Sequence, residues 1–237
     1  MSEFYVNGTA LSTFGVTWDG SQLFDKPEKD VKFFQIPARN GDLSIFNGRY
    51  KNIDIRVNCF IRENFAENFN NLMVFLYTQN GYARLENDVD TLAYRMGQYV
   101  RRTEPNTGPY NKNGLFTLEF NCMPQRFLKS GEQQISGFDF QGNLTITNPT
   151  PFDAYPYIYS YNGTGQEFTT IAINGNVVSE NYDFGTMVYD GATGYLTHTQ
   201  WGTTETEYVG RFPLHSGENT VTLTNATGYV KPNWWTL

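Results

Sequence analysis

The chain has few of the residues on which most enzyme active sites depend. Its 237 residues include two histidines and two cysteines. The motifs GxxxxGK(S/T), GxGxxG, HExxH and GxSxG do not occur in it. Two cysteines cannot build a disulfide framework, and without further ligands they cannot hold a zinc ion. We therefore predict that the protein is not an enzyme and uses no metal or other cofactor.

Long apolar runs are also missing. No stretch of about 18 apolar residues, the length of a membrane-spanning helix, occurs in the sequence. The first eight residues, MSEFYVNG, contain neither the basic region nor the apolar region of a signal peptide. These absences predict a protein that is made in the cytosol and does not insert into a membrane.

Basic residues are almost missing from the second half of the chain. Of the 17 lysines and arginines, 15 precede Gly131, as do 14 of the 24 acidic residues, so the two parts carry net charges of about +1 and −8. Such a change predicts two domains with different surfaces, which we place at residues 1–130 and 131–237. The polar segment Lys129–Gln134 contains a glycine and no apolar periodicity, which is typical of a linker.

The first part of the chain predicts an α+β domain that resembles an antiparallel β-sandwich with one helix. Phe65, Phe69, Leu72 and Leu76 follow the spacing of one helix face, with Asn64 as a candidate N-cap and Gly81 as a left-handed stop. Alternating patterns predict strands at 52–61, 81–86, 91–101 and 115–122. Cys59 and Cys122 share the apolar faces of their strands, which indicates buried free thiols.

The second part of the chain predicts a β-sandwich. Short alternating stretches recur with turn signals between them, including the pair Asn174-Gly175, which is typical of a hairpin. Tyr155, Tyr157, Tyr159 and Tyr161 fall on one face of a strand. Such a row covers the edge of a core or a subunit contact more often than it binds a ligand.

The titratable side chains show no clear pattern of a metal site or an acid/base catalytic site. His198 and His215 have no cysteine or carboxylate at metal-ligand spacing, which indicates ordinary strand or loop histidines. Asp88 and Asp90 could hold calcium or act as an acid/base pair, but the segment lacks the glycine and final glutamate of a calcium loop. A solvated turn is the better interpretation.

Aromatic residues suggest a binding surface in the second part of the chain. Planar rings present apolar faces and polar edges, so Trp201, Trp234 and Trp235 could stack on sugar rings or dock a partner protein. A carbohydrate-binding module or lectin-like adhesion protein is therefore the alternative function.

Several short motifs occur in order along nearly the whole chain. They are Phe4-Tyr-Val-Asn-Gly8, Ile36-Pro-Ala-Arg-Asn-Gly-Asp-Leu43 followed by Gly48-Arg-Tyr-Lys-Asn52, Met123-Pro-Gln-Arg-Phe-Leu128, Phe212-Pro-Leu-His-Ser-Gly-Glu-Asn-Thr220 and Lys231-Pro-Asn-Trp-Trp235. Their succession resembles the distal tail proteins of long-tailed, siphovirus-type bacteriophages and prophages.

The resemblance implies a structural protein of the virion, assembled in the cytoplasm of the host bacterium. It implies an N-terminal domain that closes a homo-hexameric ring and a C-terminal galectin-like β-sandwich. The ring would join the tail tube protein to the tail-associated lysin or tail-tip protein, and to receptor-binding or baseplate proteins for host attachment. DNA would pass through the lumen without specific binding, and the sequence contains no dense basic cluster that would grip it.

The segment between Gln35 and Asn52 is a candidate subunit interface. It contains a proline, two glycines and the charged residues Arg39, Asp42 and Arg49 between predicted strands, so it could reach a neighbouring subunit. We expect Arg39 or Arg49 to form an ion pair across the interface. A tail-tube subunit is the remaining rival, and it would form stacked polymers rather than a discrete ring.

Overall fold

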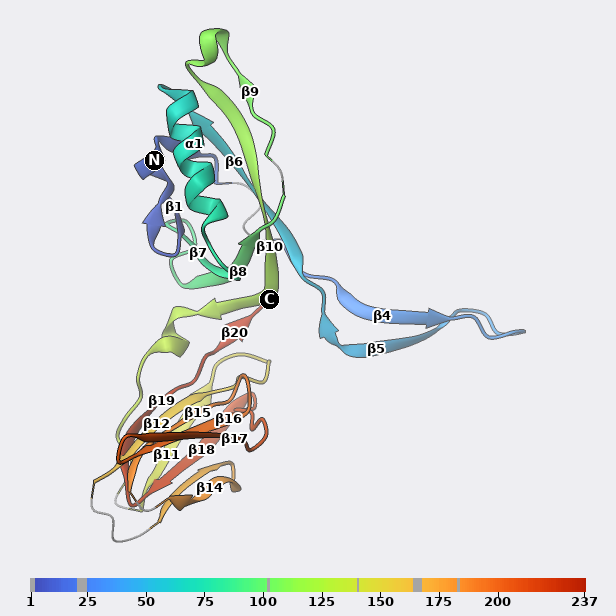
Figure 1. Ribbon diagram of the computed structural model, residues 1–237. Coiled ribbons are helices and arrows are strands. Elements are labelled where there is room, and N and C mark those ends of the chain that lie inside the picture. Colours follow the sequence, from blue (N-terminus) through green and yellow to red (C-terminus); the bar gives the residue numbers. More distant parts are fainter. Residues whose placement is uncertain (1–2, 21–24, 102, 140, 164–167, 183) are drawn as a thin grey trace. The chain divides into compact units, whose positions relative to one another are not determined.

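A computed structural model describes residues 3–20, 25–101, 103–139, 141–163, 168–182 and 184–237 (Figure 1). Within these residues the chain is mostly β-strand, as the alternating sequence patterns predicted, with one α-helix. It divides into two compact units, the first comprising residues 1–126 with Leu237 and the second residues 127–236. Among the residues that the structure describes, no helix is long and apolar enough to cross a membrane.

The first unit is built on one curled antiparallel sheet with a helix against it. Its central strand order is β2-β1-β7-β8-β10-β6-β3, and β9 pairs with β10. The elements are β1 (Phe4–Val6), β2 (Thr9–Ala10), η1 (Leu11–Phe14), β3 (Val16–Trp18), β4 (Lys29–Phe34), β5 (Leu43–Tyr50), β6 (Ile53–Ile61), α1 (Phe65–Tyr77), β7 (Ala83–Asn87), β8 (Ala93–Tyr99), β9 (Asn106–Thr107), η2 (Pro109–Asn111) and β10 (Gly114–Leu128).

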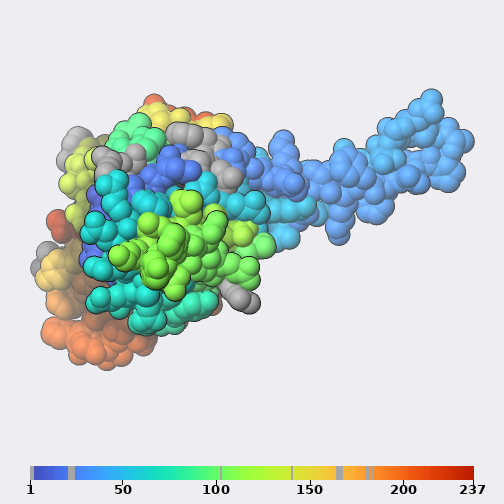
Figure 2. Space-filling model, turned by 90° about the horizontal axis from the view of Figure 1, so that it is seen from above, coloured from blue at the N-terminus to red at the C-terminus, as the bar shows by residue number. Residues whose placement is uncertain are grey.

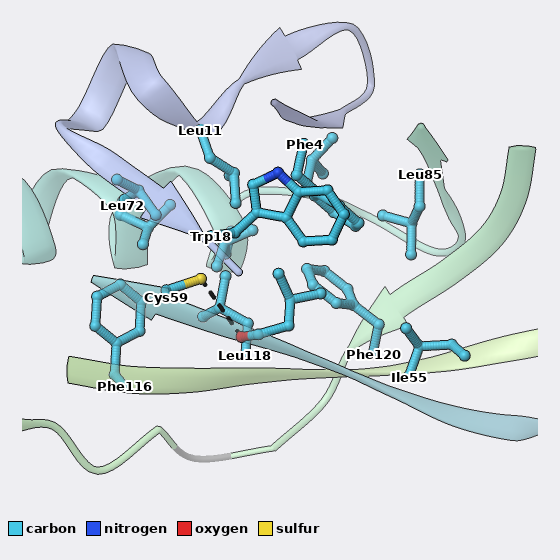
Figure 3. Packing of buried hydrophobic residues seen from close by; sticks show 14 of the residues in the cluster. Phe4, Leu11, Trp18, Ile55, Cys59, Leu72, Leu85, Phe116, Leu118 and Phe120 are labelled. Carbon is cyan, nitrogen blue, oxygen red and sulfur yellow. Dashed lines mark hydrogen bonds between the residues drawn. The ribbon is translucent and has the colours of Figure 1, made fainter. Parts of the chain in front are cut away.

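The core of the first unit lies between the sheet and α1 (Figure 3). Along β10 the even-numbered residues Phe116, Leu118 and Phe120 are buried, because successive side chains of a strand point to opposite faces. Leu72 of α1 packs against them from the other side. The expected i, i+4, i+7 stripe thus does form the buried face of the helix.

The start of α1 differs from its expected form. Asn64 lies in the left-handed region with φ 52°, and its side chain makes no capping hydrogen bond. Its carbonyl oxygen accepts a bond from the Asn68 amide at 3.0 Å, and the Phe65 amide donates to Lys112 of the neighbouring chain segment. Asn64 is therefore the N-cap residue, as predicted, but its side chain does not cap the helix, and the first helical amide finds its acceptor in a segment distant in sequence.

The β4–β5 hairpin projects from the body of the first unit. Lys29 pairs with Tyr50 and Phe34 with Leu43, with a register shift between Lys29 and Val31. Figures 1 and 2 show the two strands extending as a ribbon with no other element of that unit beside them. The segment from Gln35 to Asn52, which was expected to connect two strands, therefore includes strand β5, and its loop is confined to residues 35–42.

The second unit is a sandwich of two antiparallel sheets. One sheet has the order β11-β18-β13-β14 and the other β17-β16-β15-β12-β19. The elements are η3 (Lys129–Glu132), β11 (Asn143–Asn148), β12 (Tyr157–Asn162), β13 (Thr169–Ile173), β14 (Asn176–Tyr182), β15 (Gly185–Asp190), β16 (Tyr195–Gln200), β17 (Thr203–Tyr208), β18 (Gly217–Thr224), β19 (Thr227–Lys231) and β20 (Trp235–Thr236).

The core of the second unit lies between its two sheets. Ile171 and Leu223 come from the four-stranded sheet, and Ile158 comes from the five-stranded sheet. Tyr189 is fully buried in this core, and its hydroxyl both donates to the Gly210 carbonyl at 3.1 Å and accepts from the Phe212 amide. The buried hydroxyl therefore has the partners that burial requires.

The expected hairpin at Asn174-Gly175 joins β13 to β14. Both residues have positive φ, 50° and 79°, as a two-residue hairpin turn requires. Asn174 also accepts a hydrogen bond from the Thr220 amide through its side chain, which ties the turn to β18. The local turn signal thus also fixes a contact between distant parts of the chain.

The segment 129–134, expected to be a linker, is folded and packed against the rest of the second unit. Residues 129–132 form η3, and Gly131 is buried with its Cα against the backbone of Trp234. A Cβ at Gly131 would meet the Trp234 nitrogen at 2.3 Å, so a glycine is needed for close approach. The linker prediction for 129–134 was wrong, because the glycine here serves packing rather than flexibility.

Candidate assembly surfaces

The β4–β5 hairpin exposes apolar side chains on both faces. Ladder pairing places Val31, Phe33 and Phe46 on one face. On the other face lie Phe34, Leu43 and Ile45. The exposed fractions reach 67% for Phe33, and the other large apolar residues of the hairpin are also exposed: Phe34, Ile36, Leu43, Ile45 and Phe46. Contiguous exposed apolar surface of this kind is typical of an interaction site.

The loop at the end of the hairpin carries the charged residues expected at a subunit interface. Arg39 and Asp42 are both exposed there. Ala38 and Gly41 have φ values of 62° and 81°, so the chain turns through the left-handed region twice. The loop holds Arg39 at the far end of the ribbon, where a second molecule can reach it.

Arg49 is already paired within the chain. Its Nε donates to Asp30 Oδ2 at 2.7 Å across the hairpin. This hydrogen bond from Arg49 holds the pKa of the Asp30 carboxyl below its usual value. Nearer the base, the Lys51 ammonium lies 3.2 Å from Glu28. Of the two arginines expected to form an intersubunit ion pair, Arg39 is therefore the better candidate.

A cleft of about 810 Å³ opens on the face of the first unit's sheet that points away from the core. Its floor comes from the outward-facing residues of β6 and β10, including Phe60, Leu115 and Thr117. Leu115 is 58% exposed. One wall comes from Glu104 and Asn106, and the opposite wall comes from β3, which ends the central strand order.

Acidic groups dominate the charge of the cleft. Asp19, Glu104 and Glu119 line it, and Arg56 is the basic residue among the lining side chains. Arg56 Nε lies 3.6 Å from Glu119 Oε1, and Arg101 Nε lies 3.4 Å from the same oxygen. That oxygen is buried without a hydrogen bond, so the two arginines act on it through charge at longer range.

The three tryptophans proposed as a binding surface lie in different environments. Trp201 is 82% exposed at the β16–β17 turn and stacks on Phe184 with ring centroids 4.8 Å apart. Trp234 is only 4% exposed and belongs to the core, so its inclusion in a surface was wrong. Trp235 is partly buried, with its Nε1 donating to the Asp153 carbonyl at 2.8 Å. Trp201 alone is freely available to a ligand.

The tyrosine row lies on the outer face of the five-stranded sheet. Tyr159 stacks on Tyr229 of β19 at 5.2 Å, and Tyr157 lies 6.5 Å from the same ring. The Lys231 ammonium sits over both Tyr157 and Tyr229. These rings contact one another across strands, which supports the interpretation that the row covers the sheet.

The acidic turn at Glu86–Asp90 is a structural turn. The Asn87 side chain accepts hydrogen bonds from the amides of Val89 and Asp90. The Asp90 carboxylate is engaged by Arg126 in an ion pair in which both side chains are about 85% buried. The turn is therefore solvated at Asp88 and Val89, as expected, while Asp90 at its end is partly buried and ion-paired.

The histidines and cysteines are occupied by structural contacts. His198 is buried, with Nε2 2.8 Å from the Phe184 carbonyl, and His215 Nδ1 lies 2.9 Å from Asp153. Burial raises the pKa of the Cys59 and Cys122 thiols to about 12. Among the described residues no group of three or more His, Cys, Asp or Glu side chains could hold a metal ion.

Sequence reasoning missed the apolar faces of the hairpin and the cleft. The adjacent pairs Phe33-Phe34 and Ile45-Phe46 were the available signal, since apolar neighbours in a strand put one apolar side chain on each face. The cleft left no such signal, because its lining comes from segments spread over about a hundred residues.

Three solved structures of bacteriophage proteins are similar to this fold. The Dit protein of phage SPP1, described as a paradigm of the hub adsorption apparatus in phages infecting Gram-positive bacteria, matches over 100% of both chains with a TM-score of 0.73 and 11% identity. Two structures of the phage p2 baseplate in its activated conformation, with Sr and with Ca, contain chains that match with a TM-score of 0.54 and 9% and 10% identity. These matches cover 97% and 98% of this chain and of the baseplate chains.

No family model and no curated protein matches the sequence. The relation to the phage proteins is therefore one of fold, and it extends over the whole chain. The chain has the mainly β fold of the Dit hub proteins, as the succession of sequence motifs predicted.

Proposed function

We propose that the protein is a structural component of a bacteriophage tail, a distal tail hub that assembles into a ring between the tail tube and the tail tip or baseplate. The observation that carries the proposal is the β4–β5 hairpin, with apolar side chains exposed on both faces, on a chain with the Dit fold throughout. A segment that buries almost none of its apolar side chains in its own unit needs a partner to cover it. In a hub, neighbouring subunits supply that partner.

Six subunits in the ring is the number implied by the family resemblance. A closed ring needs a heterologous interface, in which one patch on each subunit meets a different patch on the next. The first part of the chain, with a net charge near +1, supports such contacts because it avoids strong self-repulsion. The more acidic second part is then available for receptor-binding, lysin or baseplate proteins.

The proposal does not involve catalysis. The histidines, the cysteines and Asp90 all have structural contacts, and the Glu119 carboxylate in the cleft is paired with Arg56 and Arg101. DNA would pass through the ring without being gripped, and the lack of a dense basic cluster in the sequence is compatible with a conduit.

Native mass spectrometry over a range of concentrations tests the proposal. A discrete species of six chains that binds a purified tail tube or tail-tip protein is the expected result. Stacked polymers of increasing length would instead indicate a tail-tube subunit. A monomer that persists at the highest concentration and binds no tail protein would overturn the hub.

Carbohydrate binding is the second candidate function, and the exposed Trp201–Phe184 stack favours it. Aromatic rings with open faces are suited to sugar rings. A glycan array on the monomer separates the two functions, because a lectin retains glycans without assembling. Receptor attachment through this domain would combine the two.

A further inference from the structure

An arginine occupies a core position in the sheet of the first unit. Ala93, Arg95 and Gly97 alternate as buried residues along β8, so Arg95 points to the same face of the sheet as the apolar core. Only 7% of Arg95 is exposed. Arginine is rarely buried to this degree unless its charge is paired. The core at this place must therefore accommodate a guanidinium group and its charge.

The described residues satisfy only part of the Arg95 guanidinium. Nη2 donates a hydrogen bond to the main-chain oxygen of Asp25 at 3.0 Å. Nη1 is buried and has no hydrogen-bond partner among these residues. Burial lowers the pKa of Arg95, but a guanidinium keeps its proton in proteins, so the positive charge stays. Nη1 therefore needs an acceptor, and the buried charge needs a counter-charge.

Nearby acidic groups do not supply this counter-charge. Asp90 forms an ion pair with Arg126, in which the two charges neutralise each other. Asp25 is an exposed residue, so water screens the attraction of its carboxylate for Arg95. The Cys122 thiol also lies near Arg95, but burial raises its pKa to about 12, so it is uncharged at neutral pH.

Lys26 adds to the positive charge at this place. Its ammonium donates a hydrogen bond to the main-chain oxygen of Leu237. Burial lowers the pKa of Lys26, and the charges of Arg126 and Arg95 lower it further, which shows that three basic side chains gather here. An anion placed among these side chains is attracted by all of them.

A cavity of about 20 Å³ adjoins the Arg95 side chain. Phe4, Ile55 and Leu85 contribute apolar lining, and Arg95 and Arg126 contribute positive charge. A cavity must offer roughly 10–15 Å³ to hold one water molecule, so this one holds a single particle of about that size. A polyatomic anion such as sulfate or phosphate is too large for it.

We propose that this cavity binds a small monatomic anion, a halide such as chloride, which accepts a hydrogen bond from Arg95 Nη1. A halide supplies the acceptor and the counter-charge together, whereas water supplies the acceptor alone. The bound ion joins Arg95 of β8 to Arg126 of β10, the residue at which the first unit passes into the second. The site lies within one chain, so the inference goes beyond the proposed ring and does not depend on it.

Thermal unfolding in the presence of halides tests the site. The full chain is prepared in sodium methanesulfonate, whose anion is too large for the cavity, and sodium chloride or bromide replaces this salt at constant ionic strength. We expect the unfolding temperature to rise with halide concentration and then level off, by about 2 °C or more, because a ligand that binds only the folded state stabilises it. An unfolding temperature that changes with neither halide would overturn the site.

Arg95→Met and Arg101→Met form a matched pair of variants. The first removes the guanidinium from the cavity and keeps an unbranched side chain that fits an apolar core, so the halide effect is expected to disappear. The Arg101 side chain is 55% exposed and does not line the cavity, so its variant is expected to keep the effect. Equal halide responses in the two variants would count against the assignment to Arg95.

Bromide crystallography gives a readout that needs no variant. Crystals soaked in sodium bromide are expected to show an anomalous peak within hydrogen-bond distance of Arg95 Nη1. Density there without an anomalous signal would identify water and overturn the anion. A peak without a saturable rise in the unfolding temperature would indicate an adventitious ion only, which also overturns the proposal. Ring assembly is expected with or without halide, so failure of this site leaves the hub standing.

Discussion

The guanidinium of Arg49 donates a hydrogen bond to the carboxylate of Asp30 across the β4–β5 hairpin, with 2.7 Å between Nε and Oδ2. This pair joins the two strands close to the shift in their register. It adds a side-chain contact to the backbone ladder that joins the two strands, and it leaves Arg39 for other molecules. The hairpin is thus organised before it meets a partner, which lowers the entropy lost on binding.

Removing Arg49 should raise the pKa of Asp30 toward its ordinary value. Because the pair holds that pKa down, its stabilisation is present above the unfolded-state pKa and is lost as the pH falls through the lower folded-state pKa. A carboxyl NMR titration of wild type and Arg49→Ala measures the change. Arg39→Ala is the control and should leave Asp30 unaltered, and an equal change in both variants would contradict the assignment.

The two cysteines should resist alkylation in the folded protein. Burial raises both thiol pKa values to about 12, so almost no thiolate exists at pH 8, and the sulfurs are also shielded. Iodoacetamide labelling followed by intact mass measurement should give no adduct on the native chain and two adducts in denaturant. Rapid labelling of the native protein would show that one of the strands opens.

The substitution Leu118→Ala should destabilise the first unit by about 2–5 kcal/mol, because Leu118 is fully buried and its removal leaves a cavity. Hydrogen–deuterium exchange should show faster exchange in β6 and β10 and little change in β18, which belongs to the other core. Leu92→Ala makes the same change at an exposed site and should be nearly neutral. Equal acceleration in both units would mean that they unfold together.

The substitution Gly131→Ala should destabilise the second unit by about 1–3 kcal/mol, since the new methyl group would collide with the Trp234 backbone. Chemical denaturation measures the loss. Ser130→Ala, at the exposed neighbouring position, is the control. If Gly131→Ala were as stable as wild type, the segment would behave as the flexible linker that its composition suggested.

The substitution Trp201→Asn should leave the fold intact within about 0.5 kcal/mol, because the side chain is exposed and asparagine tolerates the left-handed φ of 52° found there. Ring assembly should also be unchanged. A glycan array then decides the role of the ring system: loss of glycan retention would assign sugar binding to Trp201. Loss of the assembly of subunits in the Trp201→Asn variant would place Trp201 in a subunit interface.

The sequence predicted elements best where one periodicity dominated. The helix stripe from Phe65 to Leu76 and the inward-facing cysteines follow from local spacing, and both are found. The Asn174-Gly175 turn was predicted for the same reason, since its backbone geometry is encoded by two residues.

Predictions failed where the partner was distant in sequence. Gly131 was expected to be flexible, but it is packed against the Trp234 backbone. Asn64 does stand at the N-cap, but its side chain makes no capping bond, and the Phe65 amide donates to the carbonyl of Lys112. Trp234 was predicted to lie on the surface because no residue next to it in the sequence indicates that it packs in a core. The cleft was missed for the same reason, because the residues that line it are far apart in the sequence and come together only in the folded sheet.

The β4–β5 hairpin buries almost none of its side chains in the unit that carries it. Substitutions along it should therefore change what the molecule associates with while leaving the chain able to fold. The residues of the hairpin are therefore free to change during evolution, because such changes do not need compensating substitutions elsewhere to keep the protein stable. While the chain is alone, the apolar side chains of the hairpin face water, which favours aggregation of copies that have not yet assembled.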